Sequence, residues 1–249
     1  MYHEYIFRPL YNGLVGIMDI IPWVDVGVAV VIFTIIVKLI LFPLSKASLL
    51  TQVRMKEIEP EANKIKAQYA SNKQTQALKI MELYKEKRIK PFSGVLLLFI
   101  QLPILFALIS VFYKIIPTID VAQLYSFIAV PNNPSFHFLG LIDLSQKSFI
   151  LSLATAVIQF LQMHFSPAMR QQKLASNQPQ TNPADFASQL SGSMTKQMMY
   201  LLPILAFAST YWIIPATFPQ AASIIAIYWS VSTLFTLVQE LYIRKRHLK

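Results

Sequence analysis

Lys38 is the residue whose type and position have the clearest chemical meaning in this chain. It is the one charged residue in the apolar stretch from Val26 to Phe42. At the centre of a membrane-spanning helix a lysine costs about 2.5–3.5 kcal/mol, so it normally faces protein or water. Two interpretations are open: Lys38 lies in a wet cavity and attracts anionic groups, or its long stem carries the ammonium to a nearby aqueous interface.

Polar residues at helical spacing indicate where such a cavity would lie. Thr34 precedes Lys38 by one helical turn and therefore shares its helix face. Two further apolar segments carry polar stripes, which consist of Ser152, Thr155, Gln159 and Gln162 in one and of Tyr228, Ser232, Thr236 and Gln239 in the other. Stripes on three helices would line a hydrophilic groove. The alternative is hydrogen bonding between helices in a tight bundle, where serine and threonine are common.

Signatures of catalysis and of metal binding are missing from the sequence. The histidines, which are His3, His137, His164 and His247, do not have the spacing of a metal site, and the chain contains no cysteine. The sequence also lacks the G-x-S-x-G, H-E-x-x-H and Walker A patterns of hydrolases, metalloproteases and nucleotide-binding proteins. We therefore expect a protein that is not an enzyme and that binds no cofactor and no metal.

Hydropathy predicts the elements that carry these residues. Of the 249 residues, 55% are hydrophobic and 14% are charged, against about 25% charged in an average soluble domain. The apolar residues lie in long blocks, which predict an all-α integral membrane protein with five transmembrane helices. The expected helices are 23–44, 92–116, 148–165, 197–214 and 221–243. Between and around them we expect an interfacial amphipathic helix at 1–22, a cytoplasmic coiled-coil hairpin at 45–91, an extracytoplasmic loop at 117–147, a flexible cytoplasmic loop at 166–196, a short outer loop at 215–220 and a basic cytoplasmic tail at 244–249.

The distribution of charge predicts the orientation in the membrane. The net charge is +10, and most of the 22 lysines and arginines lie in 45–91, 166–196 and 244–249, which five spans place on one side. Because cytoplasmic loops are enriched in Lys and Arg, we expect the N-terminus outside and the C-terminus in the cytoplasm. A basic surface for nucleic acid is the alternative, but no recognition motif is present, so we expect no sequence-specific nucleic-acid partner.

Two segments outside the predicted spans also have helical patterns. Apolar residues recur at helical spacing in 1–22, which favours a helix lying in the interface over an unordered tail. In 45–91, seam patterns formed by Ile58, Ala62, Ile65 and Tyr69 and by Ala77, Ile80 and Tyr84 predict two antiparallel helices joined by a turn at Ser71 and Asn72. This hairpin is either a contact surface for a partner or a solvated arm without one.

The order and spacing of several short motifs together resemble the YidC/Oxa/Alb family of membrane-protein insertases. The resemblance extends from Ile6 to the last span. It rests on 6–12 (IFRPLYN), 34–44 (TIIVKLILFPL), 55–61 (MKEIEPE), 83–85 (LYK) with Pro91, 100–104 (IQLPI), 198–203 (MMYLLP) and 228–232 (YWSVS). Each motif alone is weak, whereas the series in this order is specific.

The resemblance implies a five-helix core with a positively charged groove that opens to the cytoplasm and to lipid. Lys38 would supply the groove charge. The residues that would line the groove and contact substrate are Thr34, Gln101, Ser152, Thr155, Gln159, Gln162, Tyr228, Trp229 and Ser232. Substrate helices would pass from the cytoplasm through this groove into the bilayer without nucleotide hydrolysis. The implied partners are nascent membrane proteins and membrane lipids, with the ribosome and the Sec translocon as further partners, and the implied location is the bacterial plasma (inner) membrane.

The sequence departs from the family pattern at three points. Lys38 stands where the family usually has arginine, and lysine keeps the charge but lacks the planar five-donor fork. The segment between Trp212 and Tyr228 is longer than usual. A large outer domain, an additional N-terminal anchor and a lipoprotein cysteine are not seen, so we expect a compact form or a trimmed chain. Two other functions stay open: a channel or transporter that uses Lys38 for an anion, and a non-catalytic chaperone for membrane assembly.

Overall fold

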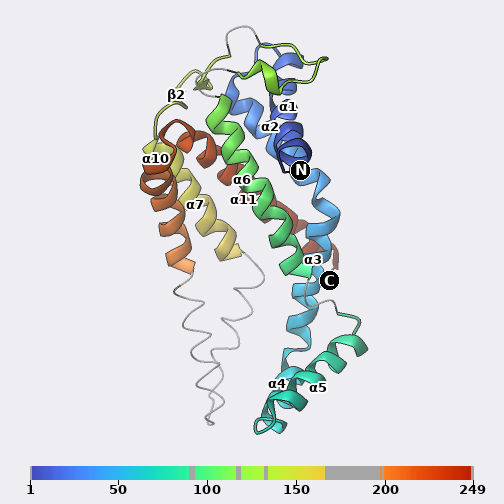
Figure 1. The fold of residues 1–249 in the computed structure, drawn as a ribbon. Helices are drawn as coiled ribbons and strands as arrows, with labels where there is room; N and C mark the ends of the chain where they lie inside the picture. Colours follow the sequence, from blue (N-terminus) through green and yellow to red (C-terminus); the bar gives the residue numbers. More distant parts are fainter. Residues whose placement is uncertain are drawn as a thin grey trace.

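The computed structural model describes residues 2–89, 93–115, 119–131, 134–165, 197 and 199–247, and all statements about structure refer to them. The predicted loop at 166–196 lies outside the described residues. Figure 1 shows a bundle of helices from which one long arm projects, with a pair of helices at its tip. Loops and short strands cover the opposite end of the bundle.

Each of the five apolar segments predicted to cross the membrane coincides with a helix. These helices are α2 (Val26–Ile40), α6 (Ser93–Ile115), α7 (Phe149–Phe165), Met199–Thr217 and α11 (Ala222–His247). By length and composition, Met199–Thr217 and Ala222–Ile243 can cross a membrane alone, and α2 can do so together with Phe42–Met55. Phe99–Ile115 and Phe149–Phe165 are shorter apolar helices. A membrane protein with two or three candidate spans is therefore established, and five spans stay a prediction.

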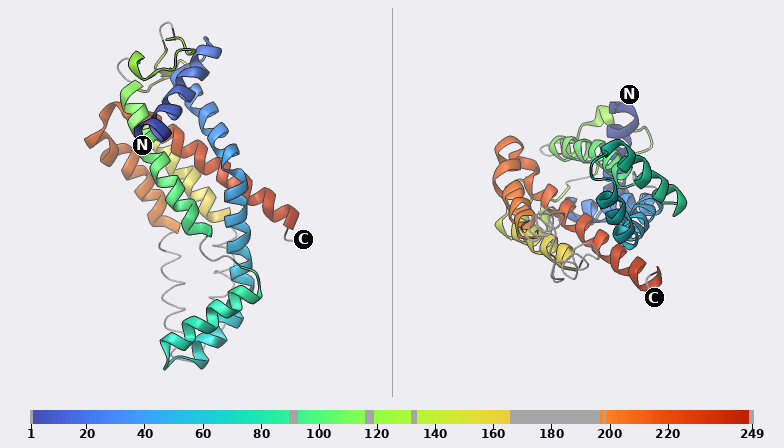
Figure 2. Two further views of the ribbon diagram at one scale, coloured as in Figure 1. Left: turned by 45° about the vertical axis from the view of Figure 1, so that its right-hand side comes forward. Right: turned by 90° about the horizontal axis from the view of Figure 1, so that it is seen from below.

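The core of the bundle is built around α11. This helix runs diagonally through the molecule (Figure 2) and packs against α7 and α2. Its first two turns, from Ala222 to Tyr228, are buried throughout. The same core includes buried residues of α2, α6 and α1 (Arg8–Ile20), among them Val30, Phe112 and Leu14. The apolar start of α11 is thus enclosed by protein.

A bend of 62° separates α2 from α3 (Phe42–Glu57). Pro43 has no N–H for the carbonyl oxygen of Leu39, and its ring would collide with that carbonyl in a straight helix. Helical hydrogen bonding resumes at once, because the Ser45 N–H donates to Leu41 O at 3.0 Å. The helix therefore breaks at Leu41, and α3 continues past 44/45 into the charged region. The end of the first membrane span at 44/45 stays a prediction.

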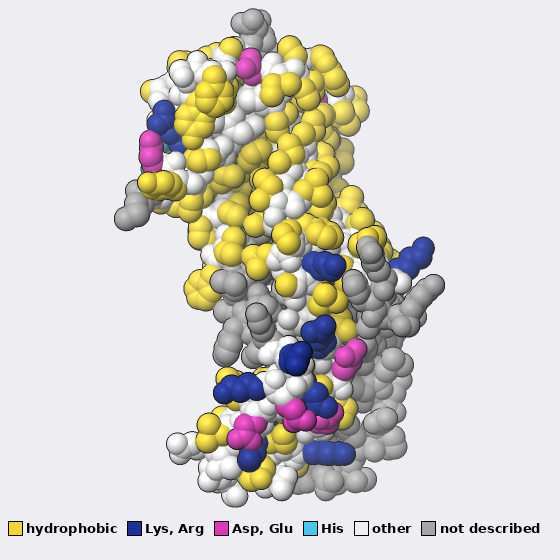
Figure 3. All heavy atoms as spheres, turned by 90° about the vertical axis from the view of Figure 1, so that its right-hand side faces the viewer, with side chains coloured by type: hydrophobic (Ala, Val, Ile, Leu, Met, Phe, Trp, Pro, Cys, Tyr) yellow, Lys and Arg dark blue, Asp and Glu magenta, His cyan; other side chains and the backbone are white. Residues whose placement is uncertain are grey.

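Two further helices form the tip of the arm. They are α4 (Glu59–Gln68) and α5 (Lys73–Glu86), which starts at an Asn72 side chain that accepts a hydrogen bond from Thr75 N. They pack through a small cluster of Ile58, Ala62, Leu83 and Ile89. The predicted seam contains the first two of these residues but not the last two. In Figure 3 the lysine, arginine and acidic side chains gather at this end, whereas hydrophobic side chains dominate the bundle.

The N-terminal helix belongs to the folded core. It starts as a π-helical turn, η1 (His3–Phe7), and continues as α1. Tyr11, Leu14, Val15 and Met18 are buried against the bundle, so this side of α1 is covered by protein. The location of the helix in the lipid interface stays a prediction. Hydropathy predicts the apolar face of such a helix but does not say what covers it.

A cap at 119–147 closes the same end of the bundle. It contains η2 (Val121–Gln123) and a small antiparallel hairpin of β1 (His137–Phe138) and β2 (Ile142–Asp143). Gly140 in the hairpin turn has φ +71°, and Leu139 has φ 53°. The Phe138 ring packs against Gly27 of α2, where a Cβ atom would collide with it. The cap is therefore fitted closely onto the start of α2.

Asn12 connects α1 to this cap. Its Nδ2 donates hydrogen bonds of 2.8 Å to Arg8 O and to Gln123 O. Its Oδ1 accepts a 2.7 Å hydrogen bond from the Tyr125 N–H. The side chain is 2% exposed, and all its contacts are to backbone groups. A polar residue in an amphipathic helix thus serves to join two segments.

Candidate functional site

Lys38 occupies the last turn of α2, next to the bend. Ile36 and Ile40 are each two residues away and so lie roughly 200° around the helix; their side chains are 43% and 70% exposed. Lys38 itself is half-buried and shares a helix face with the buried Thr34, so it lies at the border between the buried and the exposed face of α2. No carboxylate of the described residues forms an ion pair with it. Its charge is therefore held in the bundle without an acidic partner on the described part of the chain.

Thr34 does not offer a hydrogen-bonding group to a groove. Its side chain is 1% exposed, and its hydroxyl donates a 2.6 Å hydrogen bond to Val30 O one turn earlier. The residue shares the face of Lys38, so it contributes a compact, buried surface next to the charge.

The first half of the polar stripe on α7 lies inside a helix–helix contact. Ser152 and Thr155 are each 1% exposed. Thr155 Oγ1 lies 2.9 Å from Leu151 O, 3.2 Å from Ala226 O and 2.9 Å from Ser230 Oγ. These contacts join α7 to α11. Of the two interpretations of the stripe, hydrogen bonding between helices therefore describes Thr155, while Ser152 is buried one turn before it.

The second half of the stripe forms a chain of partly exposed polar groups. The Trp229 Nε1–H donates to Gln159 Oε1 at 3.3 Å. Gln159 Nε2 donates to Gln162 Oε1, and Gln162 Nε2 donates to Glu240 Oε1, both at 3.3 Å. The chain runs along the α7–α11 contact. Glu240 was not among the predicted site residues, although an acidic residue inside the last predicted span was a signal in the sequence.

Gln101 and Tyr228 form a separate pair on another side of α11. Gln101 Nε2 donates a 2.8 Å hydrogen bond to the Tyr228 hydroxyl, which joins α6 to α11. The Tyr228 ring also packs near Phe112, with 6.3 Å between the ring centroids. Tyr228 and Trp229 are consecutive, so they point about 100° apart around the helix and reach different neighbours.

The predicted site residues are thus grouped in three places. Lys38 and Thr34 lie on α2, and Gln101 and Tyr228 join α6 to α11. Ser232 is half-buried one turn after Tyr228 and shares its face of α11, and its carbonyl oxygen accepts a 2.9 Å hydrogen bond from Thr236 Oγ1. The other residues lie on α7 and α11, which pack together: Ser152, Thr155, Gln159, Gln162 and Trp229. α11 takes part in each hydrogen bond that the predicted site residues make between helices, while Lys38 belongs to a helix that packs beside it.

Gln239 is a further polar residue of α11 with a specific partner. Its Nε2 donates a 2.6 Å hydrogen bond to Ser45 Oγ and lies 3.4 Å from Phe42 O. This places α11 directly against the bend that follows Lys38. The sequence stripe contained Gln239 but gave no sign that Ser45 would be its partner.

The part of the chain that the structure describes contains no group of three or more His, Cys, Asp or Glu residues placed to hold a metal ion. The absence of enzymatic activity and of a cofactor remains a prediction from the sequence.

The family model and the individual relatives that match this chain indicate the same family. The family model described as 60Kd inner membrane protein matches residues 17–249. A protein of Fusobacterium nucleatum named membrane protein insertase YidC is 30% identical over 220 residues, which cover 88% of this chain and 86% of that protein. Proteins of the same name from Rickettsia bellii and Rickettsia akari are each 29% identical over 88% of this chain, which spans 35% of their length. The chain therefore belongs to the 60Kd inner membrane protein family, the YidC/Oxa/Alb family that its motifs resemble.

Proposed function

We propose that this protein is a membrane-protein insertase that passes substrate helices from the cytoplasm into the lipid bilayer. The observation that carries the proposal is the position of Lys38: a half-buried cation in an apolar helix, without an acidic partner on the described residues. An unpaired charge of this kind attracts a polar or acidic segment. The names of the relatives from Fusobacterium and Rickettsia support the same function.

We further propose that all five apolar helices cross the membrane. The 17 residues of α7 are at the short end of the range for a spanning helix. With five spans, the arm of α3, α4 and α5 lies in the cytoplasm, the N-terminus and the cap lie outside, and the C-terminus lies in the cytoplasm. This arrangement agrees with the positive-inside rule, because the basic residues concentrate on the arm.

The proposed mechanism uses no nucleotide. Lys38 attracts the polar or acidic segment of a substrate into a wet groove next to α11, which shortens the apolar path that this segment must cross. The apolar helix of the substrate then moves sideways into lipid, with about 25 cal/mol gained for each Å² of apolar surface that leaves water. For a negatively charged segment, the membrane potential contributes about 2.3 kcal/mol per charge and 100 mV.

The site residues have two different roles in this proposal. The half-buried Gln101, Gln159, Gln162, Trp229 and Ser232 are the candidates for substrate contact. The buried Thr34, Ser152, Thr155 and Tyr228 position the helices. The partners are nascent membrane proteins and lipids, and the ribosome and a Sec translocon are further partners that the arm and the basic tail would contact.

The test is insertion of a small single-span substrate into liposomes that contain the purified protein. Protease protection of the substrate measures insertion for the wild type, Lys38→Arg and Lys38→Met. We expect the wild type and Lys38→Arg to accelerate insertion of a substrate with an acidic outer segment, and Lys38→Met to lose most of this acceleration. A matched substrate with a neutral outer segment should depend much less on Lys38.

Two results would contradict the proposal. No acceleration by folded wild type across several substrates would remove the insertase function and leave a holding chaperone. Anion flux through the protein in the same liposomes, lost in Lys38→Met, would favour a channel or transporter instead.

A further inference from the structure

Lys147 lies beside a group of aromatic side chains at the start of α7. Its Nζ is 4.7 Å from the centroid of the Tyr211 ring. The Tyr211 ring is stacked on Phe207 at 5.5 Å and contacts Phe149 and Trp212 edge-on at 5.8 and 5.4 Å. We call Lys147, Phe149, Phe207, Tyr211 and Trp212 the Lys147 cluster. It joins two helices that are adjacent in Figure 1, α7 and Met199–Thr217.

The backbone of Lys147 is held on both sides. The preceding residue, Gln146, accepts a hydrogen bond on its carbonyl oxygen from the Ser223 hydroxyl at the start of α11. The following residue, Ser148, accepts a hydrogen bond from the Leu151 N–H of α7. Hydrogen bonds on both neighbouring residues therefore position the backbone of Lys147, whose ammonium lies over the Tyr211 ring.

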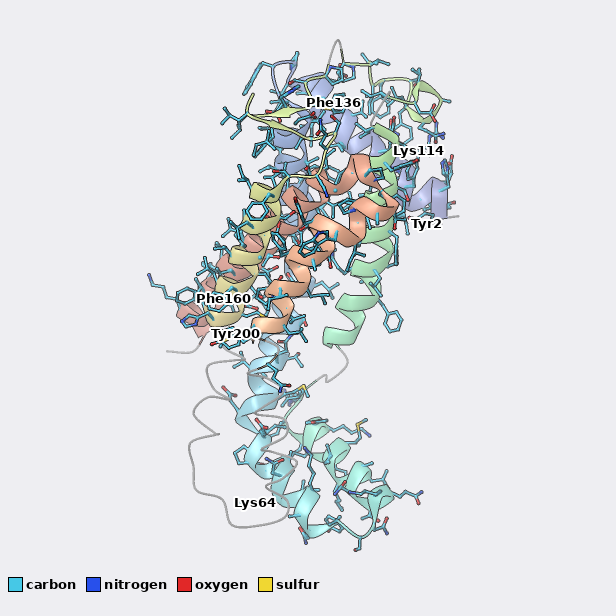
Figure 4. The ribbon with its side chains drawn as sticks, turned by 90° about the vertical axis from the view of Figure 1, so that its left-hand side faces the viewer. Tyr2, Lys64, Lys114, Phe136, Phe160 and Tyr200 are labelled. Carbon is cyan, nitrogen blue, oxygen red and sulfur yellow. The ribbon has the colours of Figure 1, made fainter. Side chains whose placement is uncertain are left out.

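Outward-facing apolar side chains continue from the cluster along both helices. Phe149 and Trp212 are 55% and 58% exposed. Below them, exposed apolar residues follow at helical spacing: Ile150, Leu153, Val157 and Leu161 on α7, and Leu201, Ile204 and Leu205 on the neighbouring helix. Phe160 and Tyr200 mark the far end of this surface (Figure 4), with 6.2 Å between their ring centroids. Such a surface on a membrane protein faces lipid chains, and the Lys147 cluster stands where it ends.

The ammonium group of Lys147 is available to an anion. Asp143 is the nearest acidic residue in sequence, but its carboxylate accepts hydrogen bonds from Ser145 and Gln146. No described carboxylate forms an ion pair with Lys147. A ring face that attracts the ammonium leaves its N–H groups free to donate to a phosphate oxygen.

We propose that the Lys147 cluster binds the phosphate region of a phospholipid in the leaflet that meets this end of the bundle. Trp212 and Phe149 would lie at the level of the glycerol groups, where amphipathic aromatic rings are favoured. Lys147 would donate to the phosphate and favour anionic over zwitterionic headgroups. This site shares no residue with the groove next to Lys38, so a negative result here would leave the proposed insertase function untouched, and the reverse also holds.

Fluorescence quenching at Trp212 tests the proposal on the full chain. The protein is reconstituted in phosphatidylcholine bilayers that contain phosphatidylglycerol, with bromine on the acyl chains of one lipid or the other. Parallel measurements with Trp212→Phe isolate the signal of Trp212 from those of Trp23 and Trp229. We expect brominated phosphatidylcholine to quench Trp212, and phosphatidylglycerol to be enriched there by up to about fivefold, the effect of one lysine near an anionic lipid.

Substitutions of lysine separate a local site from a general effect of charge. Lys147→Gln should reduce the preference for phosphatidylglycerol to near one, whereas Lys147→Arg should keep it. Lys114→Gln is the matched control: its Nζ lies 5.2 Å from the Phe7 ring, but it is not part of the cluster, so the preference at Trp212 should persist. Inorganic phosphate in the buffer should not compete.

Several outcomes would overturn the proposal. Absence of quenching by either brominated lipid would mean that the cluster does not face lipid. An equal loss of preference in Lys114→Gln, or an unchanged preference in Lys147→Gln, would remove the role of Lys147. Competition by inorganic phosphate would assign the site to the free anion.

Discussion

Gln239 of α11 donates a 2.6 Å hydrogen bond to the hydroxyl of Ser45 in α3 and thereby fastens α11 to the bend after Lys38. The bend exists because Pro43 interrupts helical hydrogen bonding. Gln239 also lies 3.4 Å from Phe42 O at the same bend. The two residues therefore join α11 to the start of the arm at the bend.

We expect Gln239→Leu and Ser45→Ala each to destabilise the protein, and the two changes to be non-additive. Hydrogen bonds between helices in membranes average about 0.6 kcal/mol and reach about 1.7 kcal/mol. Unfolding of the single and double variants in mixed detergent measures the coupling energy. Because Gln52 of α3 is exposed, Gln52→Leu serves as a control and should show no coupling to Ser45. Additive effects of Gln239→Leu and Ser45→Ala would show that the contact does not hold the bend.

Loss of Asn12 should loosen the contact between the cap and α1. Asn12→Leu leaves the Tyr125 N–H without its partner and removes one of the two donors to Gln123 O, the other being Arg8 Nε at 3.2 Å. Because a buried unsatisfied group costs about 1–3 kcal/mol, we expect a loss of stability in that range and faster hydrogen exchange at the Tyr125 amide. Asn12→Asp retains the acceptor for Tyr125 but loses the donor for Gln123, so its amide protection should be intermediate. Unchanged protection in Asn12→Leu would contradict the assigned role.

Much of this fold could be predicted from the sequence, because long apolar blocks have few alternatives in a membrane. The five helices follow from hydropathy, whereas the bend, whose cause is Pro43, was not predicted. The partner of α1 did not follow, since an amphipathic face can be covered by lipid or by protein. The role of Thr155 was open for a similar reason: a polar stripe avoids lipid equally well by facing water or by bonding to a neighbouring helix, and only the packing of α7 on α11 decides between them.

Gly27 should tolerate no side chain while Phe138 is present. In Gly27→Ala the new methyl group would collide with the Phe138 ring, and overpacking of this kind costs about 1–3 kcal/mol. Phe138→Leu in the same chain should recover part of that loss, because the smaller side chain vacates the ring position. Thermal unfolding of the two single variants and the double variant measures the recovery. If the double variant lost as much stability as Gly27→Ala or more, the collision with the Phe138 ring would not be the cause of the loss.

Acid should weaken the hairpin through Asp143. The hydroxyl of Ser145, followed by its backbone N–H, holds the pKa of the Asp143 carboxyl below its usual range. A lowered pKa in the folded state means that the stabilisation is present above the unfolded pKa and is lost as the pH falls through the folded pKa. Ser145→Ala should raise the pKa of Asp143, as carboxyl chemical shifts in an NMR titration would record. An unchanged titration would show that the hydroxyl does not stabilise the carboxylate.

Thr155 and Gln162 should respond differently to substitution, because one packs between helices and the other is a candidate for substrate contact. Thr155→Val removes a hydroxyl that is 1% exposed, so we expect a loss of roughly 0.6 kcal/mol in stability and little change in insertion per folded molecule. Gln162→Leu removes a half-buried amide from the chain that joins Gln159 to Glu240, and we expect it to slow insertion of substrates with polar outer segments several-fold. Insertion assays normalised to folded protein separate the two effects. If Thr155→Val slowed insertion as much as Gln162→Leu at equal folded concentration, the division between positioning and contact residues would be wrong.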